Sequence, residues 1–137
     1  MPGILSVASR PKRRARVTET SFEKAFAKAL LACGLKSWHM NCREAGWPDR
    51  YVVGGIWIEF KVVDALGINN GTEPEQRAKL HELERSGDKA FYCARFEDKV
   101  VIAPWHAVAG KSLAHVPRYA YRDGRDLEQI VQQVIMQ

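Results

Sequence analysis

The chain has few cysteines and no cysteine pattern that indicates a metal site. Cys33, Cys42 and Cys93 are the three cysteines of the sequence, and no two of them have the C-x-x-C spacing. An odd number without that spacing argues against a structural zinc site and for a reducing environment. We therefore expect an intracellular, cytoplasmic protein.

Long hydrophobic runs are also missing. No stretch of the sequence approaches the ~18 apolar residues that a membrane-spanning helix needs. The short apolar patch at residues 3–8, GILSVA, precedes the first basic cluster, whereas the apolar region of a secretory signal follows its basic region. We expect neither a membrane segment nor a secretory signal.

Acidic residues are absent from the first 18 positions, which hold five bases. Without these five, 16 Lys and Arg residues remain against 16 Asp and Glu residues, so the net charge of +5 lies in this arm. Such an arm, residues 1–17, suits a polyanion because neutralised phosphates release counterions; the alternative is a solubilising tail. The predicted nucleic-acid contacts of the arm are Arg10, Lys12, Arg13, Arg14 and Arg16.

The rest of the chain, residues 18–137, has the composition of one globular domain, with 46% hydrophobic and 27% charged residues overall. Periodicity predicts an α-β-β-β-α-β-β-α order, an α/β domain with a central mixed β-sheet flanked by helices. We expect Thr20 or Ser21 to cap the first helix, and Thr72 with Glu75 to form a capping box at the second long helix. The predicted helices are 20–33, 72–86 and 126–137, and the predicted strands are 35–42, 50–53, 56–63, 89–96 and 99–104.

Three charges interrupt the apolar segment GWPDRYVVGGIWIEFKV, residues 46–62. Side chains alternate along a strand, so Glu59 and Lys61 share one face. A hairpin with a three-residue loop at 53–55 places Asp49 opposite Glu59, whereas a two-residue Gly-Gly loop turns Asp49 to the other face. The chemistry described next requires the three-residue loop.

Two neighbouring carboxylates repel each other unless a cation lies between them. Mg²⁺ suits this place because it takes oxygen ligands and needs only one or two carboxylates besides water and substrate phosphate; we expect Mn²⁺ to substitute. Lys61 beside the ion would hold the attacking water or neutralise charge on the phosphorane. Asp49, Glu59 and Lys61 therefore predict phosphodiester hydrolysis, with a surface Glu–Lys salt bridge as the alternative.

Pro48-Asp49, followed ten residues later by Glu59-Phe60-Lys61, resembles the motif of the PD-(D/E)XK nuclease superfamily. Glu23, eleven residues before Gly34, is similar to an acid in the first helix of the Holliday-junction resolvases of this superfamily. The G-x-P-D run at 46–49 and Gln76 in the following helix resemble the VRR-Nuc branch, the virus-type replication-repair nucleases. The likeness covers about residues 20–103.

The resemblance implies a restriction-endonuclease-like fold and a role for each matching residue. Asp49, Glu59 and the backbone carbonyl of Phe60 would bind the metal, and Lys61 would position or activate the water. Glu23 would complete the acidic cluster, with Glu19 as its rival on the same helix. Gln76 would hydrogen-bond the lysine, the water or the phosphate; the alternative for Gln76 is a polar residue bonded to backbone at the helix start.

The resemblance implies a Mg²⁺-dependent DNA endonuclease that is selective for branched, junction or flap DNA. Two alternatives use the same residues differently: a restriction-type or general nuclease, and a non-catalytic nucleic-acid-binding protein that works through the basic arm. Arg43 and Arg50 flank the site as phosphate contacts or as ordinary salt bridges. The C-terminal apolar stripe packs on its own domain or forms a homodimer, which would cut two strands symmetrically.

Overall fold

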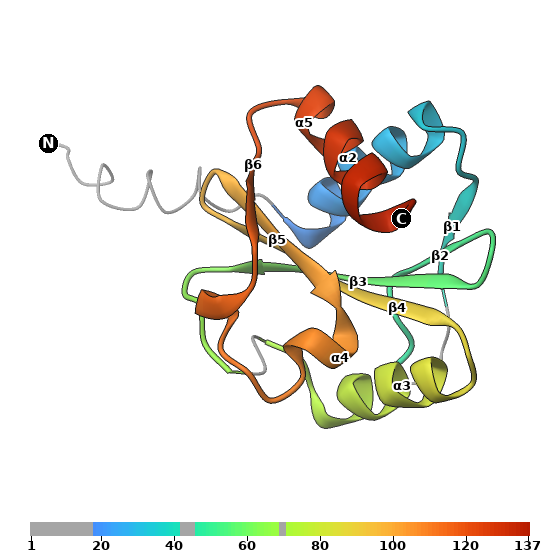
Figure 1. Cartoon of the computed structure of the whole chain (residues 1–137), viewed down its shortest axis with the longest axis vertical. Helices are drawn as coiled ribbons and strands as arrows, with labels where there is room; N and C mark the ends of the chain where they lie inside the picture. Colours follow the sequence, from blue (N-terminus) through green and yellow to red (C-terminus); the bar gives the residue numbers. More distant parts are fainter. Residues whose placement is uncertain (1–17, 42–45, 69–70) are drawn as a thin grey trace, which may run out of the picture.

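The computed structural model describes residues 18–41, 46–68 and 71–137 (Figure 1). The basic arm and Arg43 lie outside these ranges, so the contacts predicted for them stay predictions. One six-stranded sheet forms the centre, and its strands lie side by side in chain order. β3 and β4 are parallel, and the other neighbouring pairs are antiparallel. The strands are β1 (Ser37–His39), β2 (Arg50–Val52), β3 (Ile56–Val63), β4 (Lys89–Phe96), β5 (Lys99–Pro104) and β6 (Arg118–Ala120).

Helices cover both faces of this sheet (Figure 1). On one face lie α2 (Glu19–Ala32) and α5 (Gly124–Ile130), which a π-helical segment (Val131–Ile135) continues. On the other face lie α3 (Pro74–Arg85) and the short α4 (Trp105–Val108), and a 3-10 turn (Leu113–His115) follows α4. The predicted mixed sheet flanked by helices is confirmed. Within the described ranges, no helix is both long and apolar enough to span a membrane.

Each face of the sheet has its own hydrophobic core because side chains alternate along the strands. Ile58 and Phe60 pack with Phe22 and Phe26 beneath α2, and Trp57 packs on the opposite core. Glu59 lies between these core residues and therefore faces the α3 side. The C-terminal stripe packs on its own chain, since four of its five residues are buried in the α2 core: Leu127, Ile130, Val131 and Ile135, with Val134 partly buried.

The β2–β3 hairpin has the register that the site requires. Val52 pairs with Ile56, and Arg50 pairs with Ile58, which leaves a three-residue loop at 53–55. Gly54 has φ +109° in this loop, a conformation that costs little only for glycine. The predicted register is confirmed for these pairs, and Asp49 directly precedes the last of them, Arg50 with Ile58.

Both predicted helix starts were displaced. Thr18, not Thr20 or Ser21, caps α2 and accepts a hydrogen bond from the Ser21 N–H at 3.0 Å. A cap two residues earlier places Glu19 in the first turn, where the helix dipole favours an acid. At α3 the N-cap is Glu73 rather than Thr72. The Gln76 oxygen accepts from the Glu73 N–H, so the capping box joins Glu73 and Gln76, one residue after the expected pair Thr72 and Glu75.

The sequence did not predict three short elements: α4, the 3-10 turn Leu113–His115 and β6. Each is shorter than five residues, which is too short for hydrophobic periodicity to identify. β6 lies in the stretch HVPRYAYRDGR, residues 115–125, whose arginines and tyrosines suit either a nucleic-acid surface or a loop that packs its tyrosines. Tyr119 and Tyr121 pack against the α2 core, which is the second alternative.

Candidate active site

Asp49 lies where β2 and β3 separate. Its backbone carbonyl accepts from the Met40 N–H at 2.8 Å, which continues the β1–β2 pairing by one residue. Its carboxylate Oδ2 accepts from the Phe60 N–H at 2.7 Å, so the side chain takes the place of a ladder partner on β3. The N–H and C=O of one strand residue point to the same side. The Phe60 carbonyl therefore faces the gap in which the Asp49 carboxylate lies, as its predicted role requires.

Glu59 is a buried acid with one unsatisfied oxygen. The residue is 1% exposed. Its Oε2 lies 3.3 Å from Lys61 Nζ and accepts from Gln76 Nε2 at 3.1 Å, whereas Oε1 is buried and has no hydrogen-bond partner among the described residues. The pKa of Glu59 is raised to about 8, first by burial and then by the charge of Asp49, while the charge and hydrogen bond of Lys61 lower it. The predicted same-face neighbours Glu59 and Lys61 are thus in contact, and the acid lacks a full complement of positive charge.

The start of α3 brings Gln76 to Glu59. The Oε1 atom of Gln76 accepts from the Glu73 N–H at 2.8 Å and caps the helix, while Nε2 donates to Glu59. Gln76 is thus a polar residue bonded to the backbone at the helix start and, through its other end, a hydrogen-bond partner of Glu59. Gly46 makes this approach possible, because a Cβ there would lie 2.5 Å from the Glu75 carbonyl oxygen at the helix start. The glycine of the G-x-P-D run is therefore a packing requirement of the site.

Glu23 lies beside the site but on the α2 side of the sheet. Its Oε2 accepts from Arg50 Nε at 3.0 Å and lies 2.9 Å from His39 Nδ1. The side chain is 7% exposed and that of Arg50 12%, so the pair is internal. The structure thus places Arg50 in a salt bridge, which was the alternative to a phosphate contact. The sequence indicates this placement of Arg50: it is adjacent to Asp49, and neighbouring side chains on a strand face opposite sides.

The charge of Glu23 still reaches the site. Burial raises the pKa of Asp49 first, and the charges of Glu23 and Glu19 raise it further, while the hydrogen bond from Phe60 and the charge of Lys61 lower it. The exposed Glu19 also raises the pKa of Glu59. Glu19 therefore adds negative potential at both carboxylates and Glu23 at Asp49. The choice between Glu19 and Glu23 as a further ligand stays a prediction.

The residues present fit a hard divalent cation. Within the described ranges, no three His, Cys, Asp or Glu side chains are grouped so that they hold a metal by themselves. Asp49, Glu59 and the Phe60 carbonyl supply oxygen only, and the buried Oε1 of Glu59 has no other partner. Mg²⁺ keeps several waters and requires one or two carboxylates beside substrate phosphate. This donor set is sufficient for such an ion, which would replace the proton that Glu59 holds at neutral pH.

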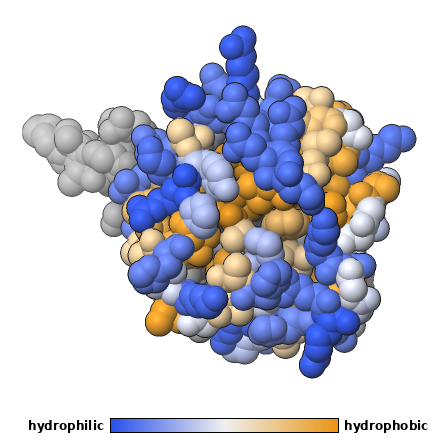
Figure 2. Space-filling view, viewed as in Figure 1, coloured by the Kyte–Doolittle hydropathy of each residue, from blue (hydrophilic) through white to orange (hydrophobic). Residues whose placement is uncertain are grey.

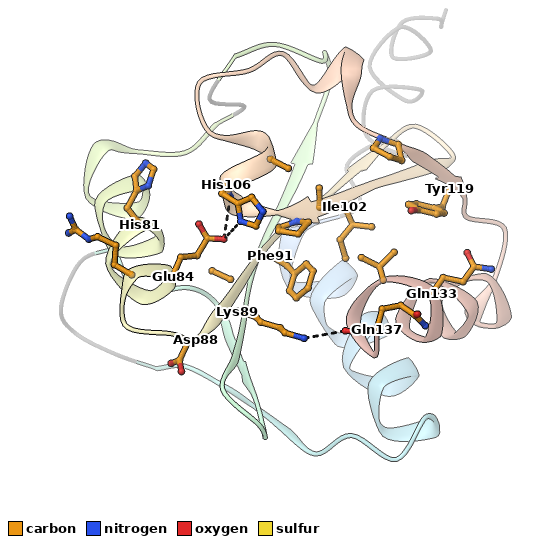
Figure 3. Close-up of a pocket in the computed structure, with 17 residues that line it drawn as sticks. His81, Glu84, Asp88, Lys89, Phe91, Ile102, His106, Tyr119, Gln133 and Gln137 are labelled. Carbon is orange, nitrogen blue, oxygen red and sulfur yellow. Dashed lines mark hydrogen bonds and ion pairs between the residues drawn. The ribbon is translucent and has the colours of Figure 1, made fainter.

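A separate hollow of about 870 Å³ opens between the amino end of β4, the carboxyl end of β5 and the C-terminal helix (Figure 3). Phe91 and Ile102 line its floor, and His106 pairs with Glu84 at its rim. Figure 2, seen from the same side as Figure 1, shows hydrophobic side chains gathered across the middle of the molecule. None of the residues predicted for the active site lines this hollow.

The sequence matches no protein-family model and no curated protein. Among solved structures, the chain is similar to Hjc, a Holliday junction resolvase from the archaeal hyperthermophile Archaeoglobus fulgidus. The TM-score is 0.52 and the identity 18%, over 64% of this chain and 77% of that chain. At this identity the similarity shows the fold alone. The α/β, restriction-endonuclease-like fold that the sequence predicted is therefore confirmed.

Proposed function

We propose that the chain is a divalent-metal-dependent endodeoxyribonuclease of the PD-(D/E)XK type, with the VRR-Nuc-like features noted in its sequence, that cuts branched DNA. One observation carries the proposal. The Asp49 carboxylate is fixed on the Phe60 N–H next to a buried Glu59 whose Oε1 lacks a partner, and Lys61 adjoins that acid. The fold shared with a Holliday junction resolvase supports the same assignment.

The side chains of the site have separate roles. The Phe60 N–H holds Asp49, and Gln76 holds Glu59, so both acids are oriented before substrate arrives. Lys61 lies where its ammonium would hold the attacking water or neutralise the negative charge that develops on the phosphorus oxygens. Mg²⁺ or Mn²⁺, when bound, supplies Lewis-acid stabilisation and lowers the pKa of water.

The proposed substrate is DNA with a junction or flap, and the proposed setting is the cell interior. The arm at 1–17 and Arg43 would add phosphate contacts. Two copies of the chain related by a two-fold axis would cut the two strands of a junction symmetrically. Most of the C-terminal stripe is buried, so a dimer would use another surface.

A cleavage assay tests this function. The purified chain is incubated with a four-way junction, a flap and a linear duplex, each with Mg²⁺, Mn²⁺ or EDTA. We expect cuts in the junction or flap with metal only, and loss of at least about a hundredfold in rate for Asp49→Asn, Glu59→Gln and Lys61→Ala. Asp98→Asn, at an exposed acid in the β4–β5 turn, is the matched control and should cut as wild type does.

The outcomes separate the rival functions. Equal cutting of linear duplex and junction would indicate a general nuclease with the same site. A wild-type chain that binds DNA but cuts none of the substrates with either metal would contradict the enzymatic proposal.

A further inference from the structure

A second groove, of about 440 Å³, lies between α2 and the edge strand β1. Lys24, Lys28 and Lys36 line it together with Arg50, and among the residues that the structure describes no acid lines it. We call it the α2–β1 groove. A groove with cations and no acids on its walls is complementary to a polyanion.

The three lysines of the α2–β1 groove are exposed. In the part of the chain that the structure describes, none of them has a carboxylate within salt-bridge distance. Lys24 and Lys28 are one helical turn apart on α2, so their charges repel each other. Phosphate groups in the groove would relieve this repulsion and release counterions.

Trp38 contributes to the wall of the groove and is 55% exposed, but its ring lies on the other side of the edge strand, the side of α3, whereas its neighbours Ser37 and His39 face α2. It lies in register with Tyr51 on β2, which in turn lies in register with Trp57 on β3. The rings of Trp38 and Tyr51 stack, with centroids 6.3 Å apart and planes 13° apart, and Tyr51 contacts Trp57 at 4.7 Å between ring centroids. This aromatic row fixes the Trp38 ring at the edge of the sheet, although more than half of the residue remains in contact with solvent.

The aromatic row connects the groove to the active-site face. Trp57 and Glu59 are two positions apart on β3 and therefore share a face, at a separation of about 7 Å along the strand. β1 is the edge strand of the described sheet, so within the described ranges no further strand lies on the path from the groove across Trp38 to this face.

We propose that the α2–β1 groove and Trp38 bind an unpaired DNA strand that leads into the active site. This inference rests on the proposed function and makes its substrate class more specific. The lysines track the DNA backbone on the α2 side, and the Trp38 ring on the other side of the edge strand offers a stacking surface to a strand that crosses β1. Proteins hold single strands with such a combination of cations and aromatic rings. A base in a duplex is covered on both faces by its neighbours, whereas an unpaired base offers a face to Trp38. The preferred substrate therefore has a single-stranded segment next to the bond that is cut, as a flap does.

The test is a binding measurement without metal, so it does not depend on catalysis. The fluorescence anisotropy of a labelled single strand of about 16 nucleotides and of a duplex of equal length is measured in EDTA. We expect Trp38→Leu to weaken single-strand binding about tenfold and leave duplex binding unchanged. Trp38→Phe keeps a ring and should retain most of the affinity. Thermal melting of each variant checks that the fold is intact.

Charge reversal tests the lysines. Lys28→Glu should weaken single-strand binding at least about fivefold and reduce the salt slope by about 0.7 for each phosphate that the variant no longer neutralises. Lys111→Glu, an equal charge change at an exposed lysine beyond α4, is the matched control and should not change single-strand binding. A strand that carries 5-iodouracil should photo-cross-link to the peptide that contains Trp38.

Wild-type single-strand affinity in both Trp38→Leu and Lys28→Glu would overturn the groove assignment, as would a wild-type chain that does not bind single strands. If the same protein still cuts DNA with Mg²⁺, the proposed function stands without the groove. If single-strand binding follows the prediction but no substrate is cut, the groove stands and the proposed function fails.

Discussion

Glu59 is the residue at which stability and function oppose each other most clearly. A buried carboxyl with one unsatisfied oxygen is unfavourable when charged, so the folded chain retains a proton up to a pKa of about 8. The unfolded chain releases the same proton near its ordinary value of 4.5. Between these two values the folded state binds more protons than the unfolded state, and its stability therefore falls as the pH rises.

The variant Glu59→Gln tests this linkage. In the absence of metal, the free energy of unfolding of wild type should fall by up to about 1.4 kcal/mol per pH unit, relative to the variant, from pH 4.5 towards pH 8. Above pH 8 the difference should level off in favour of the variant. Urea denaturation at a series of pH values measures this, and parallel curves for the two proteins would contradict the assignment.

Gln76 performs two tasks that two substitutions separate. Gln76→Ala removes both the helix cap and the donor to Glu59, so we expect a loss of about 1 kcal/mol in stability and a higher pKa for Glu59. Gln76→Glu keeps an acceptor for the Glu73 N–H but cannot donate to Glu59 and adds a negative charge, so it should raise that pKa more. Carbon NMR of the Glu59 carboxyl reports the pKa. An equal value in all three proteins would mean that Gln76 is only a cap.

At the scale of elements, the Glu23–Arg50 ion pair connects α2 to β2. Arg50→Met leaves a buried carboxylate with His39 as its remaining partner and should cost roughly 3 kcal/mol. The double variant Glu23→Leu with Arg50→Met removes both charges and should recover most of this loss. Denaturant unfolding of the three proteins measures the effect. A loss below about 1 kcal/mol for Arg50→Met would show that the pair behaves as an exposed one.

The contact between Gly46 and the start of α3 is the second element-scale feature. A Cβ at position 46 would clash with the Glu75 carbonyl oxygen, and φ there is +96°, so Gly46→Ala combines strain with displacement of the helix. We expect a loss of at least about 2 kcal/mol and weaker Mn²⁺ binding, because Gln76 moves with the helix.

Gly34→Ala is the matched control for Gly46→Ala. Its φ is +85°, but nothing lies within 4 Å of the added Cβ, so it carries the strain alone. It should leave Mn²⁺ affinity unchanged. Equal Mn²⁺ affinity in wild type and Gly46→Ala would show that the helix start does not support the site.

At the scale of the whole molecule, the sequence predicted what repeats along the chain. Alternation indicated the two faces of β3, and the requirement that Asp49 meet Glu59 selected the three-residue hairpin loop that the structure has. The elements it missed, α4, the 3-10 turn and β6, have no periodic signal and form because a nearby core or strand accepts them.

The sequence could not show how charges far apart in the chain share partners. The sequence did not indicate that Glu23 is held by Arg50 and His39 on the α2 side, next to the acidic cluster that it was expected to complete. Such pairing depends on which residues of different strands come into register, and local pattern carries little of that information. The aromatic row through Trp38 and Tyr51 was missed for the same reason, since it joins separate strands.

The central claim is that Asp49 and Glu59 share one divalent ion, and calorimetric titration with Mn²⁺ at about pH 8.5, just above the pKa of Glu59, tests it most directly. We predict one site in wild type, loss of at least about tenfold in affinity in both Asp49→Asn and Glu59→Gln, and wild-type affinity in Asp98→Asn. Affinity should also weaken as the pH falls below 8, because the ion displaces the proton of Glu59. Equal Mn²⁺ binding by wild type and the two site variants, or no binding by wild type, would contradict the account.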